Sequence, residues 1–116
     1  MSYDLNFWKY KPGVSLDHQA VYERLCDGER VDGLEDLPIE AMLTRIGEVF
    51  SKWERLDDQN YEHPDLGSFQ LSTTSQFVRV DCYGMDGEDM NPFIDIGTEF
   101  GCPLYDPQVG QRFDGA

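Results

Sequence analysis

Apolar and polar residues alternate most regularly between Phe77 and Tyr83, where the chain reads FVRVDCY. A period of two is typical of a β-strand, because successive side chains of a strand point to opposite faces of the sheet. One face of this predicted strand carries Val78, Val80 and Cys82. The other face carries Phe77, Arg79, Asp81 and Tyr83. The rest of the chain can be arranged around this strand and the segment that follows it.

The period changes to that of a helix after the acidic, glycine-containing turn that follows this strand. Apolar residues recur at helical spacing at Met90, Phe93, Ile94, Gly97 and Phe100. Gly101 suits the left-handed position after a helix, and Pro103 prevents its continuation. Pro92 leaves two possible starts for this helix. Either Asn91 is the N-cap and Pro92 the first residue, or residues 87–91 form an initial tight turn.

Four more elements follow from the same patterns. Residues 3–10 alternate and predict the first strand, and residues 68–72 predict a short one. Ser15 is a plausible N-cap for a helix from residue 16 to about residue 26. A second helix is predicted over residues 38–50, because its apolar residues form one wide stripe. That stripe consists of Ile39, Met42, Leu43, Ile46, Val49 and Phe50.

These elements predict one domain spanning residues 1–116, in the order β-α-α-β-β-α-β, with residues 104–105 as the last strand. Residues 51–67 are polar and aperiodic and predict a loop, with Trp53 anchoring it to the core. Short connections and right-handed crossovers favour an α+β, ferredoxin-like open-faced sandwich. Its four-stranded sheet would be mainly antiparallel and would carry the helices on one face. On the other face, Trp8 and Tyr83 would be exposed unless a loop or helix covers them.

Charge changes this picture more than composition does. The chain has 23 acidic and 9 basic residues, and its net charge is −14. Residues 27–40 contain six acidic residues and one arginine, residues 54–65 contain five and one, and residues 81–99 contain six acidic and no basic residues. Such a field repels nucleic-acid phosphates and attracts a basic partner. Solubility alone would also explain an acidic surface.

Catalytic and metal-binding patterns are not evident in the sequence. His18 and His63 adjoin no nucleophile motif, and the three cysteines lack zinc-ligand spacing. We expect reduced cysteines, with a Cys82–Cys102 contact left open as a geometric possibility. The acidic turn at residues 86–89 does not match a calcium loop, so helix-start acidity explains it better. We therefore expect neither an enzyme nor a cofactor.

We also expect no membrane span or signal peptide, and a cytoplasmic location.

Three stretches resemble a known group of bacterial proteins. They are SYDLNFW at the start, VRVDCYGMDGEDMN in the middle and EFGCPLYDPQVGQRF near the end. In these stretches the chain is similar to immunity proteins of polymorphic-toxin and contact-dependent growth inhibition systems. The likeness weakens between residues 27 and 66. The resemblance implies an inhibitor without enzymatic activity that binds a cognate toxin domain, often a nuclease, in the cytoplasm. It transfers no site residue position by position.

From the charge and this resemblance we predict a protein that occludes a basic toxin, with no nucleic acid or membrane as partner. An accessory or regulatory domain that binds a metabolite or another protein is the alternative. The predicted contacts comprise two acidic groups and two aromatic anchors. They are Asp32, Glu35, Asp36, Asp86, Glu88, Asp89, Tyr83 and Trp8.

Overall fold

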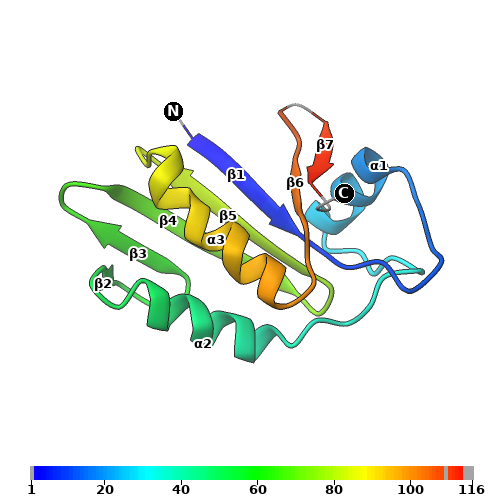
Figure 1. Cartoon of the computed structure of the whole chain (residues 1–116), viewed down its shortest axis with the longest axis horizontal. Coiled ribbons are helices and arrows are strands. Elements are labelled where there is room, and N and C mark those ends of the chain that lie inside the picture. Colours follow the sequence, from blue (N-terminus) through cyan, green and yellow to red (C-terminus); the bar gives the residue numbers. More distant parts are fainter. Residues whose placement is uncertain (1, 109, 114–116) are drawn as a thin grey trace.

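A computed structural model describes residues 2–108 and 110–113. It shows an α+β fold with three helices and a seven-stranded sheet among these residues (Figure 1). The elements, in chain order, are β1 Ser2–Phe7, α1 His18–Cys26, α2 Ile39–Val49, β2 Glu54–Arg55, β3 Asn60–His63, β4 Gly67–Thr74, β5 Phe77–Tyr83, α3 Gly87–Glu99, β6 Leu104–Asp106 and β7 Gln111–Phe113.

The strand order is β2-β3-β4-β5-β1-β6-β7, and every described neighbouring pair is antiparallel. The prediction of a mainly antiparallel sheet is confirmed. The predicted number of four strands is not confirmed, because the sheet has seven. The ferredoxin-like description is therefore not confirmed in detail. The four predicted strands are the adjacent strands β4, β5, β1 and β6. The additional strands have only two to four residues, which is too short to produce a clear period of two.

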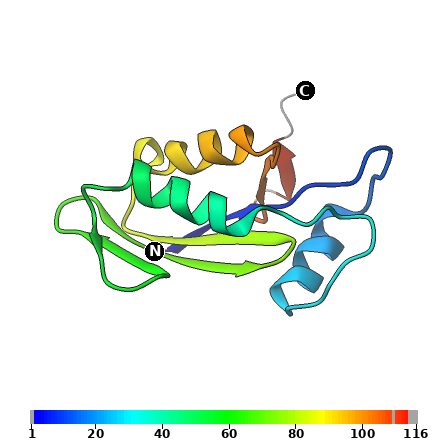
Figure 2. The same cartoon turned by 90° about the horizontal axis from the view of Figure 1, so that it is seen from below.

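Helices α2 and α3 cover one face of the sheet (Figure 2). Their apolar sides pack on the alternate residues of β1 and β5 that point to this face, which include Leu5, Phe7 and Val80. Val78 and Cys82 belong to the same buried cluster, so the predicted inward face of β5 is confirmed. Ile46 of α2 is buried there as well. This cluster is the larger of two and forms the main core of the domain.

Helix α1 lies on the opposite face, near one end of the sheet (Figure 2). A second buried cluster joins Val21 and Leu25 of α1 to Trp8, Phe77 and Tyr105. The expectation that all helices share one face is wrong for α1. The physical reason is that large aromatic side chains point from the strands to this second face and need cover from water.

The helix starts also differ from those predicted. Asp17, and not Ser15, caps α1: its Oδ2 atom accepts a hydrogen bond of 2.9 Å from the backbone N–H of Ala20. Helix α3 begins at Gly87, so Pro92 lies inside the helix and is not its first residue. The alternative with a turn at residues 87–91 is therefore closer to the structure. In the described part of the chain, no helix is long and apolar enough to cross a membrane.

Candidate functional site

The acidic loop before α2 is held against the turn that joins β4 and β5. The side chain of the buried Gln76 accepts a hydrogen bond of 2.9 Å from the backbone N–H of Val31 and donates one of 3.1 Å to its carbonyl oxygen. Within this loop, Glu35 forms an ion pair with Lys9 at 3.3 Å, and Asp36 forms one with Arg30 at 2.9 Å. Two of its three predicted contact residues are thus partly neutralised.

Asp32 is the exposed exception in this loop, and no basic side chain of the described residues lies within ion-pairing distance of it. Exposed ion pairs are weak, about 0–1 kcal/mol each, so Glu35 and Asp36 can exchange partners when another protein approaches. The loop remains a source of negative charge, although a weaker one than a count along the sequence suggests.

The second acidic group lies at the start of α3. Asp86 is its N-cap residue, and Glu88 and Asp89 lie in its first turn. The positive end of the helix dipole favours carboxylates there, which explains why the sequence tolerates three of them together. Among the described residues, no basic side chain is within ion-pairing distance of these three. No described side chain therefore neutralises this turn.

The two acidic groups do not meet in one patch. The loop is bonded to the turn that precedes β5, where the N–H of Leu37 donates to the carbonyl oxygen of Ser75 at 2.8 Å. The group at Asp86 follows the other end of the same strand. A strand of seven residues separates its ends by about 20 Å. A partner would have to span the length of the sheet to contact both groups.

The two predicted aromatic anchors differ in burial. Trp8 is completely buried, so its assignment as a partner contact is wrong. Its ring packs on Tyr105 at a centroid distance of 5.1 Å, and the guanidinium of Arg112 lies 5.6 Å from the ring centre. Strand β1 ends at Phe7. The next residue, Trp8, is covered by α1 and by the loop that follows this helix. Tyr83, in contrast, is 45% exposed at the end of β5.

A charged network lies beside α1 on the second face of the sheet. The Nε atom of Arg79 donates to Asp81 at 3.0 Å, and Tyr22 donates to Asp4 at 2.9 Å. Burial alone would lower the pKa of Arg79, but the hydrogen bond and charge of Asp81 raise it overall. Burial and the hydrogen bond to Asp4 raise the pKa of Tyr22. The positive charge of Arg79 is thus compensated within the protein, which leaves it poorly suited to holding a phosphate.

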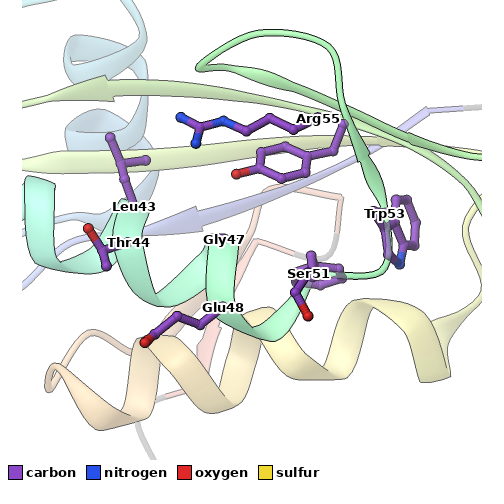
Figure 3. Close-up of a pocket in the computed structure, with 9 residues that line it drawn as sticks. Leu43, Thr44, Gly47, Glu48, Ser51, Trp53 and Arg55 are labelled. Atoms are coloured by element: carbon purple, nitrogen blue, oxygen red, sulfur yellow. The ribbon is translucent and has the colours of Figure 1, made fainter.

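A groove with a volume of ≈ 480 Å³ lies between α2 and the β2–β3 hairpin. Figure 3 shows Leu43, Thr44 and Glu48 on the helix side, with Trp53 and Arg55 on the hairpin side. The sequence prediction missed this groove because the hairpin was expected to be a loop. The apolar Tyr61 between the polar Asn60 and Glu62 is too short a pattern to establish a period of two.

The residues that could perform catalysis have structural partners. The Nδ1 atom of His18 lies 2.7 Å from the hydroxyl of Tyr10, and His63 accepts a hydrogen bond from the backbone N–H of Asp65 at 3.1 Å. All three cysteines are free, so the possible Cys82–Cys102 bridge is not formed. Within residues 2–108 and 110–113, no three His, Cys, Asp or Glu side chains gather as metal ligands.

The candidate site is therefore a set of separate surfaces. They are the acidic loop before α2, the acidic start of α3, the exposed Tyr83 and the groove between α2 and the β2–β3 hairpin. Such surfaces can bind a partner by charge and by apolar contact. Comparison with known proteins gives no match to a protein-family model, a curated protein or a solved structure.

Proposed function

We propose that this protein is an immunity protein, which binds a cognate toxin domain in the cytoplasm and neutralises it by covering its functional surface. The toxin is a basic domain, and a nuclease is the class that fits best. A nuclease must present positive charge to phosphates, and the same charge would attract a protein with a net charge of −14.

The observation that carries this proposal is the carboxylate group at Asp86, Glu88 and Asp89, which no basic side chain of the described residues neutralises. These side chains gain stability from the helix terminus. Together with the partly neutralised loop at residues 27–36, they place negative charge at both ends of the sheet. Long-range attraction would bring the toxin close, and short-range contacts would then hold it.

Coexpression with the products of the neighbouring genes, as candidate toxins, tests the proposal. We expect the wild-type chain to restore cell growth and to co-purify with the toxin domain. The Asp86→Asn, Glu88→Gln and Asp89→Asn triple variant tests the role of the acidic group. It should fold but protect less well at low expression. Continued killing in cells that contain the folded wild-type protein, without co-purification, would contradict the proposal.

A further inference from the structure

Part of the second sheet face is left uncovered. Helix α1 lies below only one end of the sheet, and the strands at the other end have no helix beneath them (Figure 2). We call this uncovered area the open sheet face. It is formed by the outward residues of β3, β4 and the end of β5, namely Asn60, Glu62, Ser68, Gln70, Ser72 and Tyr83.

The two most exposed large apolar side chains of the described residues lie together on this face. Leu56 is 55% exposed and Tyr83 is 45% exposed, and both line one hollow of ≈ 220 Å³. The other two exposed apolar side chains, Leu16 and Val49, lie elsewhere in the structure and line none of this hollow. Exposed apolar side chains that gather in a depression are a feature of protein interfaces, and tyrosine is enriched at the centres of such interfaces.

Two separate hollows lie along β4. Ser68 and Gln70 line the first, and the next outward residue of the strand, Ser72, lines a second hollow of ≈ 430 Å³ beside α1. These side chains are polar, and they alternate with the buried Phe69 and Leu71. We call these two hollows and the outward residues of β4 that link them the trough; it runs from Tyr83 to the C-terminal end of α1. Its length suits an extended segment or a helix of another protein better than a small molecule.

The charges around the trough specify the kind of partner. Glu62 borders the first hollow, and Glu54 lies opposite it in the strand register and is exposed. Asp81 borders the second hollow together with Arg79, whose charge Asp81 and Asp4 compensate. The margin of the trough is thus acidic overall. It complements a basic segment and disfavours nucleic acid or a second, equally acidic copy of this chain.

We infer that this trough is the docking surface for a basic protein segment, which inserts an apolar side chain between Leu56 and Tyr83. The identity of the partner as a toxin rests on the proposed function, whereas the position of the surface does not. The acidic groups at the ends of the sheet attract the partner, and the trough provides the close contacts that hold it.

Two measurements test this inference separately from the proposed function. The first titrates the ¹⁵N-labelled protein with a synthetic amphipathic Lys/Leu peptide at low salt. We expect the largest amide shifts along β4, at Tyr83 and at Leu56. The largest shifts on the outer side of α2 and α3, or no saturable binding, would overturn the inference. Concentration-dependent self-association through the same face would overturn it as well.

The second measurement compares affinities for the toxin domain. We expect the Leu56→Ser and Tyr83→Ser double variant to weaken binding at least about 30-fold, mainly through faster dissociation. The matched Leu16→Ser and Val49→Ser double variant should change it less than about threefold. Equal effects of the two pairs would overturn the inference and leave the immunity function intact. If the wild-type protein does not bind the toxin domain, the proposed function fails, and the peptide titration still decides the position of the surface.

Discussion

Gly97 lies where α3 comes closest to β1 and to the chain after the helix. A Cβ atom at this position would be 2.6 Å from the carbonyl oxygen of Cys102 and 2.6 Å from the ring of Phe7. We predict that Gly97→Ala destabilises the protein by about 1–3 kcal/mol, because the backbone contact cannot yield and outweighs the better helix propensity of alanine. Urea unfolding measures this. Gly87→Ala is the control, since a Cβ there meets nothing within 4 Å. Equal stability of both variants would show that α3 packs less closely.

The three thiols differ in burial and therefore in reactivity. Cys26 is exposed, whereas Cys82 and Cys102 are buried. Burial raises the pKa of Cys82 to about 12 and that of Cys102 to about 11, so neither forms a reactive thiolate near pH 8. We predict one fast-reacting thiol with Ellman's reagent in the native protein, three in denaturant, and none in a native Cys26→Ser variant. Three fast thiols in the native protein would contradict the described burial.

At the scale of elements, α2 provides a test of the core. Ile46 is buried between this helix and the sheet, whereas Val49, three residues later, is 39% exposed. Ile46→Ala should cost about 2–5 kcal/mol of unfolding free energy, and Val49→Ala should change it by less than about 0.5 kcal/mol. Ile94 of α3 is only partly buried, so its truncation should cost less than that of Ile46. Similar losses at Ile46 and Val49 in urea unfolding would contradict the packing of α2.

The same elements show how far the sequence predicts the structure. Helix α2 and strand β5 could be predicted because each repeats one period over at least seven residues. The hairpin of β2 and β3 could not, since its pairing depends on contacts such as the stacking of Tyr61 on Phe69 at 4.7 Å. The prediction that Trp8 is an exposed partner contact was wrong for a related reason. A period of two identifies the second face of the sheet, but it does not show that α1 covers one end of that face and leaves Tyr83 uncovered.

At the scale of the whole molecule, the position of charge matters more than its amount. Residues 27–36 and the turn at residues 86–89 lie at opposite ends of β5, and the trough along β4 lies on the face between them. The sequence indicates acidic clusters, but it does not show that Lys9 and Arg30 partly neutralise the first. We therefore expect the cluster at residues 86–89 to contribute more to long-range attraction than the loop does.

The association rate with the purified toxin domain, followed by stopped flow across a range of salt concentrations, tests the central claim most directly. For the wild-type protein we predict a rate that falls at least about tenfold between low salt and about 0.5 M NaCl, because salt screens electrostatic attraction. The Asp86→Asn, Glu88→Gln and Asp89→Asn variant should associate more slowly and depend less on salt. The Asp32→Asn, Glu35→Gln and Asp36→Asn variant should show a smaller change in the same direction. An association rate that is the same for all three proteins and at every salt concentration would contradict the claim that this acidic surface recruits a basic toxin.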